Sequence, residues 1–188
     1  MFAGHFGIAA AARIKAPKLP LWSLLVSSQL MDIVFIPFNL AGLEVIEPIG
    51  EGGYGNMMIH AFYTHSLVGA LILSLIAAFV AQKIWGDQSG LITGAIVFSH
   101  WILDLIVHRP DLPILPGSIG DFPLLGFGLW NIIPASIFLE LLLISIGAFY
   151  YTKTTLSISN SDSKKKKIVL SIAVTAFLFL SLAVDIFL

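Results

Sequence analysis

The sequence predicts an all-α protein built into a membrane, a polytopic helix bundle with about five transmembrane helices and an N-terminal half-helix. Of the 188 residues, 57% are hydrophobic and only 11% are charged, whereas soluble domains carry about 25% charged residues. A soluble core of this size could not bury so much apolar surface. We therefore expect lipid to surround most of the chain, which forms a single integral membrane domain over residues 1–188.

Several apolar stretches are long enough for a spanning helix, which needs about 20 mostly apolar residues. They cover residues 21–40, 59–82, 89–108, 128–151 and 168–188. Segment 2–14 is shorter and would reach only about 18–20 Å as a helix. Its many glycines and alanines permit close helix contact. We expect a half-helix packed against the bundle, with a helix on the membrane surface as the alternative.

The basic residues predict the orientation. Alternating spans place loops 13–18, 83–88 and 152–167 on one side of the membrane. These loops hold Arg13, Lys15, Lys18, Lys83, Lys153 and Lys164 to Lys167, which leaves only Arg109 on the other side. Because cytoplasmic loops are enriched in Lys and Arg, the Lys164–Lys167 run should be cytoplasmic. The acidic loop 41–58 and the proline-rich loop 109–127 should lie outside. The net charge of −1 gives no indication of a nucleic-acid partner.

Three polar residues of the third span share one helix face. His100, Asp104 and His108 are spaced four residues apart, and each step of four turns a helix by about 400°, so all three lie on one stripe. A charge in hydrocarbon costs about 2.5–3.5 kcal/mol, and such residues are usually paired and functional. The stripe is consistent with a metal site, a proton or ion path, or a structural polar network.

Other polar residues lie at similar depths. Asp32 lies about 18 Å along its helix from Pro20, while His100 and Asp104 lie about 16–22 Å from the start of theirs. These depths are compatible with one cluster. His60 is expected to face the outer surface, and Glu140, in the middle of its span, must have a partner.

The absence of cysteine limits the metals that such a site could bind. Histidine and aspartate ligands suit zinc, and also manganese, iron or nickel. Zinc with three protein ligands and an open position lowers the pKa of its bound water to about 7. Two metals about 3.5–4 Å apart would suit phosphoester cleavage. The residues leave the number of metals open.

A set of motifs resembles a bacterial inner-membrane protein family whose members are labelled permease or membrane-bound metal-dependent hydrolase. The resemblance to this family covers about residues 1–140. Its motifs are Met1-Phe-Ala-Gly-His5, Gln29 with Asp32, Tyr63-Thr-His65-Ser66, Ser99-His100-Trp101 with Asp104, His108-Arg-Pro-Asp-Leu-Pro113, Gly126-Phe-Gly-Leu-Trp-Asn131, and Glu140.

The order of these residues also resembles zinc-dependent phospholipase C. That likeness implies a metal held by His5, Asp32, His65, His100 and Asp104. Two departures count against a complete trinuclear site. Asp32 is not followed by a second aspartate two residues later, and no histidine follows His108.

The leading hypothesis is a metal-dependent hydrolase in the outer half of the membrane that acts on a lipid phosphoester. The expected cofactor is a divalent metal, zinc first. His108 would be a ligand or a general acid/base, and Arg109 would bind an anionic phosphate at the mouth of the site or extend to the outer headgroups. A transporter for a metal ion or proton is the alternative, and a structural or partner-binding membrane protein is the third hypothesis. The oligomeric state stays open.

Overall fold

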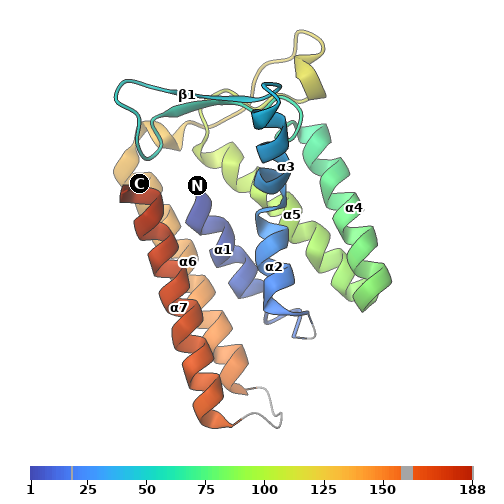
Figure 1. Ribbon diagram of the computed structural model, residues 1–188, viewed down its shortest axis with the longest axis vertical. Helices are drawn as coiled ribbons and strands as arrows, with labels where there is room; N and C mark the ends of the chain where they lie inside the picture. The colour runs from blue at the N-terminus through green and yellow to red at the C-terminus, as the bar shows by residue number, and fades with distance from the viewer. Residues whose placement is uncertain (18, 158–162, 188) are drawn as a thin grey trace.

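The computed structural model describes residues 1–17, 19–157 and 163–187. Lys18, part of loop 152–167 and Leu188 lie outside these residues. The helices are α1 (Phe2–Ala12), α2 (Leu21–Ser28), α3 (Leu30–Leu40), α4 (Leu67–Trp85), α5 (Asp87–Val107), α6 (Ile133–Ser157) and α7 (Lys164–Phe187), with 3-10 turns η1 (Pro116–Ser118) and η2 (Leu129–Asn131). This architecture confirms the predicted all-α bundle (Figure 1).

Four of the helices, α4 to α7, are each long and apolar enough to cross a membrane. Helices α2 and α3 satisfy the same test only as a pair, because they meet at a bend of 50°. The chain is therefore a membrane protein with four spans, or five if the bent pair is one span.

The bend in the first expected span follows from its polar residues. Gln29 leaves the helical conformation, at φ −110° and ψ 8°. Just before it, the Ser27 hydroxyl donates to the Ser23 carbonyl and the Ser28 hydroxyl to the Leu25 carbonyl. Such bonds compete with the helix ladder and often bend helices. The break frees backbone carbonyls in the interior of the protein.

Two further spans begin later than expected. Residues 57–60 belong to a hairpin in which β2 (Met57–His60) pairs antiparallel with β1 (Val45–Pro48). Helix α4 begins only after Ser66, whose hydroxyl caps it by accepting from the Gly69 amide at 2.9 Å. Helix α6 begins at Ile133 rather than 128, after the turn η2. The hydropathy pattern placed the starts of α4 and α6 too early, because many of the residues just before them are apolar although not helical.

The short helix α1 packs inside the bundle, against α6, α7 and α2, which confirms the expected half-helix. Ala3, Ala9 and Ala10 are fully buried. A Cβ at Gly7 would lie 2.6 Å from the Leu143 carbonyl oxygen, so only glycine permits this approach of α1 to α6. The β-hairpin lies across the end of the bundle where α1 begins (Figure 1).

Candidate metal centre

Four histidines and two aspartates converge beneath the hairpin. His5 comes from α1, Asp32 from α3, His65 from the segment before α4, and His100 and Asp104 from α5. His108 is the residue that ends α5, so the third member of the expected stripe lies just beyond the helix. The four histidines and Asp104 are all at most 3% exposed. The Asp32 side chain is 39% exposed, which makes it the accessible member of the group.

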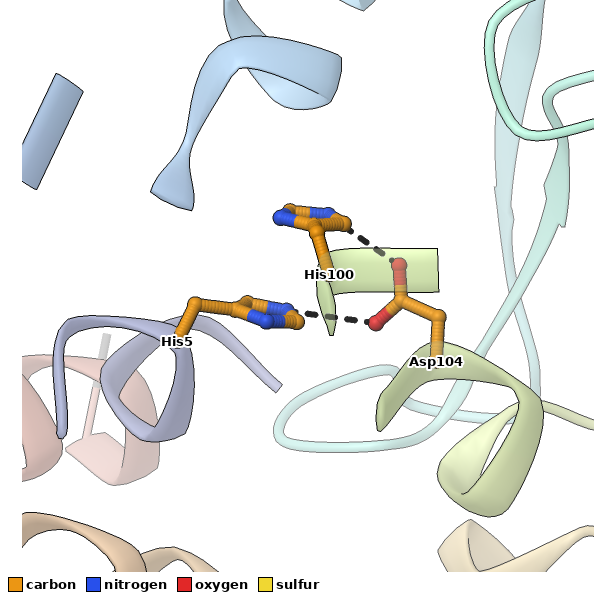
Figure 2. Close-up of side chains that lie close together, drawn as sticks. All are labelled: His5, His100 and Asp104. Carbon is orange, nitrogen blue, oxygen red and sulfur yellow. Dashed lines mark ion pairs between the residues drawn. The ribbon is translucent and has the colours of Figure 1, made fainter. Parts of the chain in front are cut away.

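Asp104 stands at the centre of the group. Its Oδ2 lies 3.1 Å from His100 Nε2, and its Oδ1 lies 3.3 Å from His5 Nε2. Figure 2 shows these three side chains, with the two imidazoles on one side of the carboxylate. The same two oxygens are 3.7 Å from His65 Nε2 and 3.8 Å from His108 Nε2. Each oxygen of Asp104 therefore faces two histidines.

Asp32 is the second carboxylate of the group. Its Oδ1 lies 3.3 Å from His65 Nε2 and 3.5 Å from His100 Nε2. Two sets of three residues offer ligand atoms within 4.8 Å of one another, His5–His100–Asp104 and Asp32–His65–His100. One imidazole nitrogen binds one ion, so the shared His100 would serve a single metal. His100 could therefore complete either set, but not both at once.

The ring of His100 is held by the broken helix. Its Nδ1 lies 2.7 Å from the carbonyl oxygen of Ser28, the last residue of α2. Carbonyls at a helix end have no partner within the helix. A carbonyl only accepts, so Nδ1 must carry the proton and donate. In the neutral ring the lone pair then lies on Nε2, the atom that faces the carboxylates.

His65 is held in the same tautomer as His100 by a chain of hydrogen bonds through Thr64 to Glu44, the Glu44 relay. The Thr64 hydroxyl donates its one proton to Glu44 Oε2 at 2.8 Å, and its oxygen lies 2.8 Å from His65 Nδ1. Because that proton is committed to the carboxylate, His65 Nδ1 must donate to the hydroxyl. The neutral ring again directs the Nε2 lone pair inward. Glu44 is fully buried and also accepts from the Tyr63 and Thr64 amides.

His108 forms a pair with Asp111. The His108 Nδ1 lies 2.9 Å from Asp111 Oδ1, and the other oxygen of Asp111 accepts from the Ile59 amide at 3.2 Å. Both side chains are buried. A carboxylate on Nδ1 selects the tautomer with a free Nε2 and raises the basicity of the ring. The indole of Trp130 lies against this imidazole, with ring centroids 4.4 Å apart.

The position of His5 depends on how α1 is held. Its ring stacks on His100, with centroids 3.7 Å apart and an interplanar angle of 6°. The first turn of α1 donates to two carboxylates, from the Gly4 amide to Glu140 at 2.9 Å and from the Phe2 amide to Asp185 at 3.1 Å. The expected partner of Glu140 is therefore the start of α1. Carboxylates are favourable there because a helix N-terminus carries partial positive charge.

Tyr54, near the tip of the hairpin, donates its hydroxyl to the second oxygen of Glu140 at 2.6 Å. Burial raises the pKa of the Tyr54 phenol, and the hydrogen bond to Glu140 raises it further. The phenol thus stays protonated and ties the hairpin to the bundle.

The geometry calls for positive charge between the rings and the carboxylates. Unprotonated Nε2 atoms at 3.1–3.8 Å from carboxylate oxygens are acceptors facing acceptors. His5 has no partner on Nδ1, so its neutral ring can carry the proton on Nε2 and donate to Asp104. His65, His100 and His108 have Nδ1 engaged, so each would need an added proton or a metal ion on Nε2. No lysine or arginine is among the described residues that line the adjoining cavity. These buried His/Asp groups could therefore hold a metal ion.

A cavity of about 660 Å³ opens beside the cluster. All the predicted ligands line it, as does His108. The remainder of its lining is mostly apolar, from α1, α3, α7 and the hairpin. Ligands on one side and an open cavity on the other leave room for a reactant at the metal.

Arg109 and His60 lie apart from the cluster. The Arg109 guanidinium donates to the carbonyls of Gly55 and Met57, at 2.6 and 3.2 Å, and does not line the cavity. It therefore holds the hairpin, and the role predicted for it in binding a phosphate stays a prediction. His60 lies in β2, 3.4 Å from Glu47 of β1, and is partly exposed as expected.

Sequence reasoning missed Asp111 and Glu44 as parts of the site. The spacing of Asp111, three residues after His108, was a signal for this pair. Glu44 gave no comparable signal, because Glu47 and Glu51 follow it in an acidic loop. Comparison of the chain with known protein families, with curated proteins and with solved structures finds no match.

Proposed function

We propose that this chain is a membrane-embedded metal-dependent hydrolase that acts on a phosphoester of a lipid. His65, His100 and Asp104 would hold the metal, with His5 and Asp32 completing the site. One observation carries the proposal. Backbone and side-chain acceptors hold His65 and His100 so that their free Nε2 atoms meet two carboxylates at the wall of a cavity. The resemblance of the motifs to a family labelled metal-dependent hydrolase also supports it.

Zinc is the metal we propose first, with manganese, iron or nickel as alternatives, because the donors are imidazoles and carboxylates. When bound with one position open, zinc would lower the pKa of a water there to about 7, so that a general base could remove its proton easily at neutral pH. Asp32, the most accessible of the ligands, lies on the cavity side, where a phosphate oxygen would approach.

His108 is the general base in this proposal. Its Nδ1 is engaged by Asp111, while its Nε2 faces the centre of the cluster. The oxygen of this water would attack phosphorus and form the new P–O bond as the ester P–O bond breaks. The proton of the water passes to His108 Nε2 and then to the oxygen of the departing alcohol. Asp111 would stabilise the imidazolium that forms in between.

A transporter for a metal ion or a proton is the second candidate. The observation that favours it is the broken pair α2–α3, whose break at Gln29 lies beside the cluster. Broken helices that meet at polar sites are common in transporters. In that case the chain would move zinc or protons across a vesicle membrane without cleaving any ester.

The test is the turnover of the zinc-loaded protein in vesicles that contain a phospholipid with a radiolabelled headgroup. We expect headgroup release, and His108→Gln should slow it about 100–10,000-fold, the usual contribution of a general base. Metal content should stay the same. His60→Gln, on the hairpin surface, is the matched control and should keep full activity.

Three outcomes would count against the hydrolase. They are zinc-loaded protein that releases no headgroup, His108→Gln as active as the wild type, or equal losses in His108→Gln and His60→Gln. Zinc uptake into vesicles without headgroup release would favour the transporter instead.

A further inference from the structure

Two helices flank the cavity without packing on one another. Helix α3 packs on α2, α4 and α5, whereas α7 packs on α1 and α6. In Figure 1 they stand on either side of the first turn of α1, whose Phe2 lines the cavity. The cavity therefore lies between α3 and α7, both of which contribute lining residues.

Several residues at this opening are apolar and exposed. Ile36 and Leu40 of α3 are 55% and 82% exposed, and Val184 of α7 is 50% exposed. All three line the cavity. Phe2, between them, is also exposed. In a membrane these side chains would contact acyl chains, which are as apolar as leucine.

The hairpin covers the opposite approach, from water. Ile46, Met57 and Ile59 of its two strands line the cavity from above. Its tip is tied down by Tyr54 on Glu140, and its second strand by Arg109. The hairpin therefore covers the cavity on its side, while the approach between α3 and α7 is bordered by exposed apolar side chains, with Asn39 and Asp185 beside them.

We propose that the opening between α3 and α7 is a binding site for the acyl chain of a membrane lipid. The lipid enters sideways from the bilayer, its chain lying against Ile36, Leu40 and Val184 and its polar headgroup reaching Asp32 and the histidines. The cavity, about 660 Å³, has the size of an ordinary ligand pocket and would hold only part of a two-chain lipid. The remainder would stay in the bilayer, which requires an open side.

The inference rests on the proposed function for the chemistry of the headgroup, but the chain-binding site can be tested without turnover. The full chain, loaded with zinc, is placed in vesicles of phosphatidylcholine and phosphatidylglycerol with a trace of acyl-radiolabelled phosphatidylglycerol. The photoreactive residue benzoylphenylalanine replaces Phe2, and illumination cross-links it to whatever lies beside it. We expect radiolabelled lipid on the protein.

Tryptophan substitutions separate the opening from the outer surface of the protein. Ile36→Trp should fill the opening and remove most of the capture at Phe2. Ile33→Trp is the matched control, because Ile33 is exposed on the same helix but does not line the cavity, and it should retain the capture. Benzoylphenylalanine in place of Leu75, on the exposed face of α4, should capture lipid in every variant and shows that each one is inserted.

The chain-binding site would be refuted if Leu75 captures lipid and Phe2 does not. It would also be refuted if Ile36→Trp leaves capture at Phe2 unchanged, or if Ile33→Trp lowers it as much. Capture that is lost only in Ile36→Trp, in a protein that releases no headgroup, would support the chain-binding site and reject the hydrolase. Release of phosphate from a water-soluble ester, with no capture at Phe2, would support the hydrolase and reject the chain-binding site.

Discussion

Replacing Asp104 with asparagine tests the centre of the cluster. The change keeps the size and one carbonyl oxygen and removes the negative charge. Both carboxylate oxygens of Asp104 are within 3.8 Å of histidine nitrogens, from four different rings. If these atoms surround a metal, Asp104→Asn loses a ligand or the group that orients one. Metal affinity should then fall about 10–100-fold.

The expected effect on stability follows from linkage. At free zinc about 100 times the dissociation constant, the wild type gains about 2.7 kcal/mol from binding. For a variant that binds 100-fold more weakly, the same zinc concentration equals its dissociation constant, and the gain is about 0.4 kcal/mol. Zinc should therefore stabilise the wild type by about 2.3 kcal/mol more than Asp104→Asn.

Without zinc, Asp104→Asn should be at least as stable as the wild type. The asparagine amide can donate to an imidazole Nε2, where the carboxylate presents only another acceptor. A purely structural cluster, held by a protonated His100 and ionised Asp104, predicts the opposite. There the substitution would cost up to about 1–2 kcal/mol, as membrane hydrogen bonds do, whether or not zinc is added.

The measurements are metal content by elemental analysis and unfolding with and without zinc, on proteins purified side by side. Asp121→Asn is the matched control, because Asp121 is exposed in the loop before α6. Equal zinc content and equal stabilisation in the wild type and Asp104→Asn would refute the metal centre, as would the absence of zinc from both under metal-replete conditions.

Three further predictions concern the scaffold. Gly147→Val should prevent the packing of α1 against α6, because the valine side chain would overlap the backbone of α1. The yield of folded protein should fall. Ser145→Val, on the exposed side of α6, is the control and should not lower the yield. Tyr54→Phe should cost about 1.5–3 kcal/mol in the free energy of unfolding, the usual value for a hydrogen bond to a charged group. The pKa of Tyr54 is raised in the folded protein, so the contribution of Tyr54 to stability is complete below about pH 10, its pKa in the unfolded chain, and declines at higher pH. The wild type should therefore lose more stability at alkaline pH than Tyr54→Phe. Equal dependence of stability on pH in the two proteins would contradict this. For orientation, an impermeant thiol reagent should label Ile119→Cys but not Lys165→Cys in intact cells, since this chain has no other cysteine; the reverse pattern would invert the predicted topology.

The sequence by itself determined the class of protein and one face of the site. Apolar composition and span length predict a membrane bundle, because the transfer of side chains into lipid is a local property of each segment. The alignment of His100 and Asp104 also follows from sequence, because residues four apart lie on one face of any helix. Their contact at 3.1 Å agrees with that expectation.

Only the tertiary structure decided what surrounds that face. The stacking of His5 on His100 and the approach of Asp32 to both rings depend on long-range packing of α1 and α3. The same is true of the Glu44 relay behind His65, since nothing in a run of acidic loop residues says which one is buried. The break at Gln29 likewise gives His100 its carbonyl partner at a point where hydropathy shows one continuous span. Periodicity reports which side of an element is apolar, whereas the partner of a polar atom depends on which distant segment packs against it, and that is decided when the helices assemble.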